Sequence, residues 1–384
     1  MEARGTRPTA KRVKMNVEGA LKIEGHMLKA VRNFLSILLK KRIVDFLLVP
    51  QEISHGRSLV QTLVKDPAHL DRANPFSPVM PMNSATIVSQ LTADKPGKKL
   101  GVVLKPCEIR ALIELTKLGQ ASLEDLIIIG TDCLGTYEVE DYAKLIEEME
   151  GAAEKKGTRI LTEMRQSITD PDTGLPISLR SACRMCNAIT PPLADITLGL
   201  FGPEDEIFIS LESDLAQKLG LELKETRDRQ EVIAELIKSR TAVREQVFSE
   251  FRDKMATPAD FADALATCTR CYACQSACPI CYCRVCFFQT ETFAPESERY
   301  FRWAEREDAL RMPTEILLFH LTRLNHIAAS CVGCGMCESA CPHDLPLTTI
   351  FEAVGDGVQK ALDYEPGRSL EDEIPTAAFK ETGT

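Results

Sequence analysis

Two short stretches of this chain hold cysteines at a spacing that could bind metal clusters. The first spaces its cysteines as C-x2-C-x2-C-x3-C ahead of Pro279: Cys268, Cys271, Cys274 and Cys278. The second repeats that spacing ahead of Pro342: Cys331, Cys334, Cys337 and Cys341. Such runs supply the thiolates of [4Fe-4S] clusters, whereas a zinc site has no use for three cysteines arranged in this way. We therefore predict two [4Fe-4S] clusters.

The two runs also predict which cysteines share a cluster. In two-cluster ferredoxins the last cysteine of each run ligates the other cluster. The first expected set of ligands is Cys268, Cys271, Cys274 and Cys341. The second expected set is Cys331, Cys334, Cys337 and Cys278. For the remaining cysteines of the first stretch we favour packing beneath the cluster, with a further metal as the alternative: Cys281, Cys283 and Cys286.

Four more cysteines could form a third site. Cys107 follows the apolar run 100–105, and Cys133 follows the run 125–130. If these runs are parallel strands, both thiols lie at the carboxyl edge of the sheet, where ligands bind in open α/β folds. Cys183 and Cys186 form a C-x2-C pair. The four thiols could hold a third cluster, but a zinc site or buried packing thiols remain open on spacing alone.

The elements that must position these cysteines follow from the apolar pattern. Short continuous apolar runs predict strands of a mostly parallel sheet with both faces covered: 44–50, 100–105, 125–130 and 206–210. Helical spacing predicts helices from Pro106, over 226–255 and over 314–327, with leucines of the last in the core.

The predicted fold is an α/β domain followed by an α+β two-cluster [4Fe-4S] ferredoxin-like domain with a helical insertion, residues 279–330. The expected domains are a flexible arm over 1–20, the α/β domain over 21–225, a helical linker over 226–258, the ferredoxin-like domain over 259–350 and a tail over 351–384.

Composition excludes several classes of protein. The net charge of −10 argues against nucleic acid as the main partner, because phosphate binding needs a basic face and the one basic cluster is the short arm 4–14. No apolar run is long enough to span a membrane, and the amino terminus shows no secretory signal. Fifteen closely spaced cysteines indicate metal ligation in a reducing compartment, so we expect a cytoplasmic protein.

Several of these segments resemble a known family. VVLKPCEIRAL, IIIGTDCLG and CRMCNAITPPLADITLG are similar to the signature blocks of the coenzyme F420 hydrogenase/dehydrogenase beta-subunit family, and CPICYCRVC resembles its formate dehydrogenase branch. The resemblance implies a [4Fe-4S] cluster beside an FAD that exchanges a hydride with the deazaflavin F420. It implies cluster ligation by Cys107, Cys133, Cys183 and Cys186.

The motifs that bind the flavin in this family are matched less completely than the cysteines. The segment KIEGHMLKAV keeps only Gly25 of the family's glycine turn, and Asp195 matches the ADI block. The resemblance implies that these two residues contact FAD. Asn187-Ala188 and Gly199-Leu200 depart from the family pattern, and no GxGxxG loop supports a Rossmann-type nicotinamide site.

These features predict an iron-sulfur flavoprotein subunit of an anaerobic redox complex. It would transfer electrons between F420 or NADH and a partner through FAD and [4Fe-4S] clusters. The expected partners are a formate dehydrogenase alpha subunit, a hydrogenase or a heterodisulfide reductase. The alternatives are a flavin-free iron-sulfur subunit that transfers electrons and docks partners, and a zinc-bound scaffold. The sequence indicates no catalytic residue for proton transfer.

Overall fold

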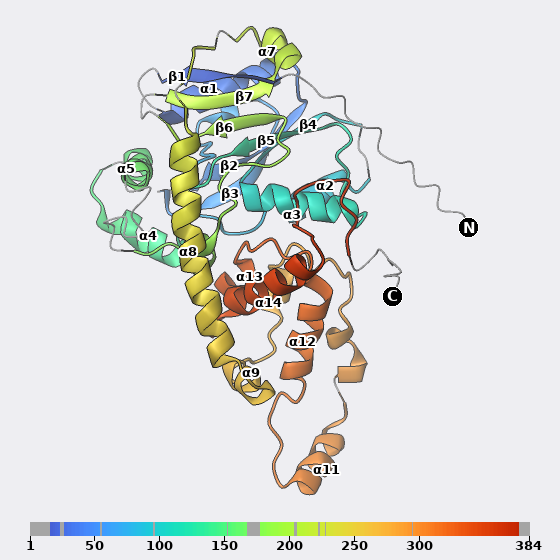
Figure 1. Ribbon diagram of the computed structural model, residues 1–384. Coiled ribbons are helices and arrows are strands. Elements are labelled where there is room, and N and C mark those ends of the chain that lie inside the picture. The colour runs from blue at the N-terminus through green and yellow to red at the C-terminus, as the bar shows by residue number, and fades with distance from the viewer. Residues whose placement is uncertain are drawn as a thin grey trace, which may run out of the picture.

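The structure is a computed structural model. It describes residues 16–23, 27–53, 56–94, 97–151, 153–166, 177–202, 206–221, 223–226, 228–293 and 295–375. A sheet with flanking helices forms one half of the molecule, and helices and loops form the other half (Figure 1). The long helix α8 runs along both halves and connects them in sequence.

The sheet has seven strands in the order β1-β7-β6-β5-β4-β2-β3 among the described residues. Their bounds are β1 Asn16–Lys22, β2 Phe46–Glu52, β3 Leu59–Val64, β4 Leu100–Leu104, β5 Leu126–Thr131, β6 Ile196–Gly199 and β7 Glu206–Glu212. β2, β4, β5 and β6 pair in parallel, whereas β1, β3 and β7 are joined by antiparallel pairing. The sheet is therefore mixed, with a parallel centre.

The register of the parallel centre explains why β4 and β5 end together. Val103 pairs with Ile129 and Leu104 with Gly130, so the chain leaves both strands at the same edge. All of β4 is buried, as its continuous apolar sequence predicts for a strand covered on both faces. Cys107 and Cys133 follow at this edge.

The helices of the first half are α1 Met27–Lys40, η2 Pro67–Leu70, α2 Ala85–Thr92, α3 Pro106–Lys117, α4 Val139–Glu148, α5 Ala153–Gln166, α6 Ser181–Met185 and α7 Ser213–Leu219. Proline at the first position of α3 suits a helix start, because its missing N–H would have no partner there. Ile109, Leu112 and Ile113 on α3 belong to the same core cluster as Phe319 and Phe351 of the second half. The two halves thus share one hydrophobic core.

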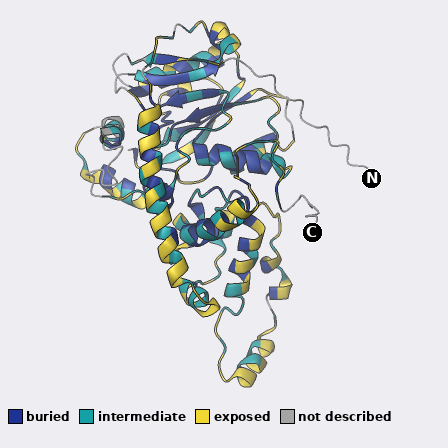
Figure 2. Cartoon of the chain, in the orientation of Figure 1, coloured by how far each residue is buried: buried dark blue, intermediate teal, exposed yellow. Residues whose placement is uncertain are grey.

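The second half is built of helices: α8 Gln230–Lys254, α9 Pro258–Ala264, α10 Ala273–Ser276, η3 Phe287–Gln289, η4 Glu291–Phe293, α11 Ser297–Glu307, α12 Ile316–Ile327, α13 Met336–Ser339 and α14 Leu347–Ala361. The described residues from 258 to 375 contain no strand, so the α+β arrangement predicted for this half is not seen there. One face of α8 is exposed along its length, and α11 has no buried residue (Figure 2).

Three sequence predictions need correction. Residues 16–20, expected in a flexible arm, form part of β1, which pairs with β7. The segment expected as a tail from residue 351 is helical through Ala361 and buries Phe351. On α12, Leu318 and Leu321 are half exposed, although their spacing predicted a place in the core. In each case the contacts that decide the structure come from segments distant in the sequence, which a local pattern does not show.

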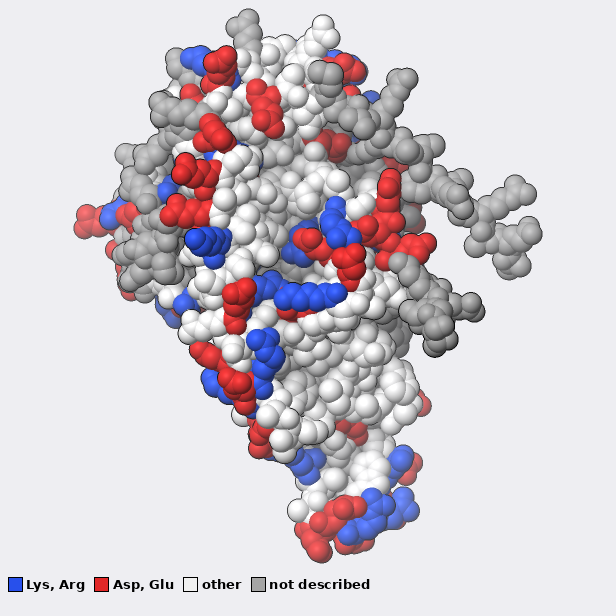
Figure 3. All heavy atoms as spheres, in the orientation of Figure 1, with Lys and Arg blue, Asp and Glu red and all other residues white. Residues whose placement is uncertain are grey.

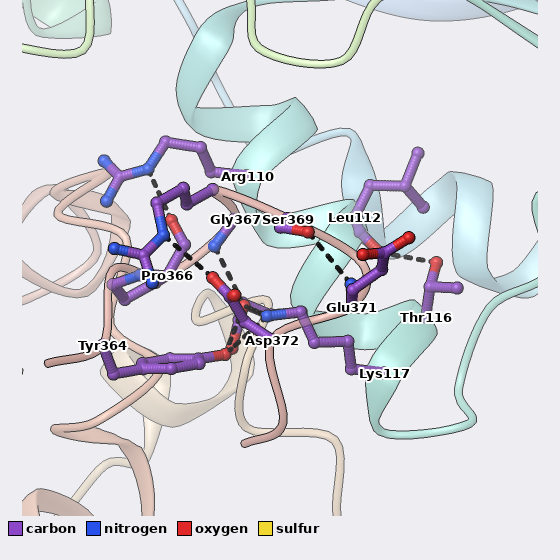
Figure 4. A network of polar contacts seen from close by, with 12 residues as sticks. Arg110, Leu112, Thr116, Lys117, Tyr364, Pro366, Gly367, Ser369, Glu371 and Asp372 are labelled. Carbon is purple, nitrogen blue, oxygen red and sulfur yellow. Dashed lines mark hydrogen bonds and ion pairs between the residues drawn. The ribbon is translucent and has the colours of Figure 1, made fainter. Parts of the chain in front are cut away.

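After α14 the chain is held against α3 by a buried polar network (Figure 4). The fully buried carboxylate of Glu114 accepts hydrogen bonds from the Tyr364 hydroxyl at 2.7 and 2.8 Å and from the Gly367 amide at 2.9 Å. Lys117 Nζ lies 2.9 Å from the same carboxylate. Arg110 Nε donates to the Pro366 carbonyl at 2.8 Å.

We expect Tyr364→Phe to lower the free energy of unfolding by about 1.5–3 kcal/mol, because it removes a donor from a buried carboxylate. Urea unfolding followed by circular dichroism measures the change. Arg368→Gln is the control, since Arg368 is exposed and its ion pair with Asp372 should contribute little to stability. Equal effects of the two substitutions would contradict a structural role for the network.

No helix among the described residues is long and apolar enough to cross a membrane.

Candidate iron-sulfur centres

The two cysteine runs fold into the same loop. In the first, the second and fourth residues after Cys268 have left-handed backbones, Arg270 with φ 55° and Tyr272 with φ 63°. In the second, Gly333 and Gly335 occupy the equivalent positions with φ 65° and 73°. A short helix then begins at the same offset in both, α10 and α13. A left-handed backbone is uncommon for arginine and tyrosine and costs energy. The first run therefore adopts the same loop as the second although its backbone is strained.

The first site joins residues from both runs. One small pocket is lined by Cys268, Cys271, Cys274 and Cys341. The Arg270 amide points at Cys268 Sγ with a separation of 3.4 Å. Hydrogen bonds of this kind stabilise cluster thiolates and adjust their reduction potential. The structure thus places Cys341 beside the three cysteines of the other run, as the crossed ligand sets predict.

Helix α12 supplies polar side chains to this site. Arg323 Nη1 lies 3.1 Å from Cys274 Sγ, and His320 Nε2 lies 3.4 Å from Cys268 Sγ. Both side chains are buried, and neither Arg323 Nε nor His320 Nδ1 has a hydrogen-bond partner among the described residues. Burial lowers the pKa of His320 to about 4, so the imidazole is neutral at pH 7. Unpartnered buried donors beside sulfurs fit a site whose remaining acceptors are cluster atoms.

The second site is more deeply buried. Burial raises the pKa of Cys331 to about 12, and burial likewise raises the pKa of Cys334 and Cys337. The charges of Cys331 and Cys334 also act on Cys337. Cys278 and Cys337 both act on the Arg323 guanidinium, as do Cys274 and Cys281. Free thiols at such positions resist ionisation, so bound metal is needed to hold them as thiolates.

The third site lies at the carboxyl edge of the sheet. One small pocket is lined by all four predicted cysteines, Cys107, Cys133, Cys183 and Cys186. The ends of β4 and β5 place the first two, and α6 places the other two. Among the described residues no three His, Cys, Asp or Glu side chains are arranged to hold a single metal ion.

Positive side chains surround the third site. Arg180 donates through Nε to Thr136 at 2.8 Å and lies 3.7 Å through Nη2 from Cys183 Sγ. Burial acts to raise the pKa of Cys183, but Arg180 and the Thr136 hydroxyl outweigh burial and leave the pKa below its usual value. Arg240 on α8 donates to the carbonyls of Leu134 at 2.5 Å and Cys186 at 3.4 Å.

The second and third sites adjoin. Gly333 and Cys334 line the cavity of the third site together with the four cysteines. A Cβ atom at Gly335 would lie 2.5 Å from Ala182 Cβ, next to Cys183 in sequence, so only glycine allows this approach. Sequence spacing gave no indication of this contact, because the two segments are far apart in the chain.

Only one of the two residues implied to contact FAD belongs to the described part of the chain. Gly25 lies outside the described residues. Asp195 lies at the start of β6, where its Oδ2 accepts a hydrogen bond from the Ile128 amide at 2.9 Å. β6 runs parallel to β5. Asp195 precedes β6 and therefore lies toward the amino-terminal ends of these strands, whereas Cys133 follows the carboxyl end of β5. A different region, an apolar cavity of about 100 Å³, shares Met80 and Lys105 with the third cysteine site.

The extra cysteines of the first run differ in their surroundings. Cys281 and Cys286 pack against the hydrophobic core, as predicted. Cys283 is exposed, so the packing prediction is wrong for that residue. Contact with Cys278, the largest cause, and burial raise the pKa of Cys281.

The chain matches two known protein families. Residues 97–228 match the family described as the C terminus of the coenzyme F420 hydrogenase/dehydrogenase beta subunit, and residues 264–345 match the 4Fe-4S dicluster domain. These matches confirm the resemblance found in the sequence and the presence of a 4Fe-4S dicluster domain.

Similar proteins include two curated relatives and one solved structure. The F420-dependent formate dehydrogenase subunit beta of Methanocaldococcus jannaschii is 26% identical over 371 residues, which are 88% of this chain and 91% of the relative. The F420-dependent formate dehydrogenase 1 subunit beta of Methanococcus maripaludis is 26% identical over 319 residues, 73% and 75% of the two chains. A chain of the F420-reducing [NiFe] hydrogenase complex from Methanosarcina barkeri has a TM-score of 0.45 and 13% identity, covering 64% of this chain and 93% of that one.

Proposed function

We propose, on the premise that residues 97–228 belong to the coenzyme F420 hydrogenase/dehydrogenase beta-subunit family, that this chain is an iron-sulfur flavoprotein subunit of a redox complex. It passes electrons between a hydride carrier, F420 or NADH, and a partner subunit. The observation that carries the proposal is the single cavity lined by Cys107, Cys133, Cys183 and Cys186 beside the dicluster domain.

The chain's own residues fit three [4Fe-4S] clusters. The donor sets are all cysteine, and buried amides and arginines point at the sulfurs, as cluster sites require. The ligands would be the two crossed sets predicted from the sequence and the four cysteines of the third site. When bound, a flavin would accept the two electrons of a hydride together and the clusters would carry them singly.

The three sites form a series. The third site adjoins the second through Gly333 and Cys334. The second adjoins the first at Arg323, which is close to Cys337 of one and Cys274 of the other. Cys271 of the first site is exposed, so the series runs from the sheet edge to the surface of the second half. This is the arrangement that a chain of electron carriers needs.

The apolar cavity beside the third site is the best candidate for FAD. Its mostly apolar walls are typical of cofactor pockets. Lys105 lines this cavity and donates to the Ser77 carbonyl at 3.0 Å. Met80 lines both this cavity and the cysteine site. A flavin ring placed here would lie next to the third cluster.

We expect about one FAD per chain to be released on acid denaturation, with reduced F420 bleaching the bound flavin faster than NADH does. Val60→Trp should fill the cavity from β3 and lower the flavin content while iron stays unchanged. The matched control is Leu63→Trp, an equally exposed apolar position on β3 that does not line the cavity.

Fully iron-loaded protein without flavin would favour the alternative function, a flavin-free electron-transfer and docking subunit. Flavin that NADH reduces and F420 does not would keep the mechanism and change the donor.

The electron-accepting partner would bind near the first site. Several apolar side chains of the second half are exposed, including Val285, Phe287 and Leu321. Much of the surface of the second half is uncharged between α8 and the charged tip at α11 (Figure 3). The proposed partner is the catalytic subunit of a formate dehydrogenase or hydrogenase, or a heterodisulfide reductase.

A further inference from the structure

Two arginines lie buried where consecutive cysteine sites meet. Arg180 lines the pocket of the third site with Cys107 and Cys183, and Cys334 of the second site lines the same pocket. Arg323 Nη1 lies 3.1 Å from Cys274 Sγ of the first site, and Cys278 and Cys337 of the second site are near enough for their charge to act on it. Their exposed fractions are 5% and 4%. Each guanidinium therefore faces two sites at once.

These cations have no ordinary counter-ion. Among the described residues, no carboxylate lies within ion-pair distance of Arg180 or Arg323, and Glu138 acts on Arg180 only from farther away. Arg323 is held instead by Cys274, through Sγ at 3.1 Å and the carbonyl at 3.2 Å, and by the ring faces of one phenylalanine on α12 and one on α14, at 5.6 and 4.7 Å. A buried charge without compensation is strongly destabilising. Negative charge at the cysteine sites is the compensation available.

We propose that Arg180 and Arg323 set the reduction potentials of the clusters on either side of them and balance the charge of the series. This inference rests on the proposed function. A [4Fe-4S] cluster with its four thiolates carries about two negative charges when oxidised and about three after it gains one electron. A fixed cation a few ångströms away favours the more negative form, so each arginine raises the potential of its nearest cluster. Arginine stays protonated throughout, so no proton accompanies the electron.

The two arginines act on different clusters. Arg323 contacts Cys274 and acts mainly on the first site, whereas Arg180 contacts Cys183 and acts mainly on the third. Both also reach the second site, which lies between them. Removing either cation should therefore shift one outer cluster most, and the outer cluster should differ between the two variants.

Arg323→Gln in anaerobically prepared, full-length protein tests this inference. Iron is counted first, and each cluster is then titrated with dithionite and mediators while its electron paramagnetic resonance signal is followed. At a fixed potential, the reduced-to-oxidised ratio of the first cluster should fall at least about tenfold, which corresponds to about 59 mV. Arg180→Gln should cause the same fall in the third cluster.

Two further variants separate charge from structure. Arg323→Lys keeps the charge and should titrate within about threefold of the unaltered protein. Arg306→Gln removes an exposed arginine at the end of α11 and should change no potential. If Arg323→Gln fails to load iron, Arg323→Lys decides: a loaded lysine variant with a tenfold lower ratio would overturn the charge role.

The outcomes also separate this inference from the proposed function. Full iron and unchanged potentials in Arg323→Gln would overturn the inference and leave the function standing. An unaltered protein without clusters would overturn the function itself.

Discussion

Replacing Cys183 with serine should lower the iron content from about twelve to about eight per chain and abolish the signal of one cluster. Cys183 lines the cavity of the third site with three other cysteines. Its Sγ lies 3.7 Å from Arg180 Nη2 and 3.4 Å from the Thr136 hydroxyl. These two groups favour the thiolate form of Cys183 more than that of the other cysteines of the site. Iron analysis and electron paramagnetic resonance of anaerobic protein measure the loss.

The control for this prediction is Cys283→Ser, since Cys283 is exposed and belongs to none of the three sites. It should retain all the iron. A Cys183→Ser protein that kept three signals would show that this residue is not a ligand.

The second large effect is expected from Cys341→Ala. Cys341 belongs by sequence to the second run, yet it lines the first site with Cys268, Cys271 and Cys274. Its removal should therefore destroy the first cluster and leave the second, with a loss of about four irons. Anaerobic crystallography of the variant identifies which cluster disappears.

Cys281→Ala is the matched comparison, because Cys281 is a partly buried cysteine of the same domain outside the predicted ligand sets. It should keep both clusters. Loss of the second cluster in Cys341→Ala, with the first intact, would show that each run keeps its own last cysteine.

The sequence was most informative where local spacing determines structure. The two cysteine runs predicted two equivalent loops, because three cysteines at x2 spacing already define most of the backbone path. The apolar runs that became β4 and β5 predicted that Cys107 and Cys133 follow parallel strands, and the structure pairs these two strands directly. Neither inference needed knowledge of distant contacts.

Distant contacts account for what the sequence did not predict. His320 and Arg323 lie on a helix far in sequence from Cys268 and Cys274, so nothing local marks them as neighbours of sulfur. Phe351 reads as part of a polar tail until α14 is seen to pack on the shared core. Asp195 matches a family block, but its carboxylate accepts the Ile128 amide within the sheet.

The count of iron and of cluster signals in the unaltered, anaerobically purified chain tests the central claim most directly. Three four-iron clusters predict about twelve irons per chain and three signals on reduction. A reproducible value of about eight irons with two signals would contradict the cluster assigned to Cys107, Cys133, Cys183 and Cys186.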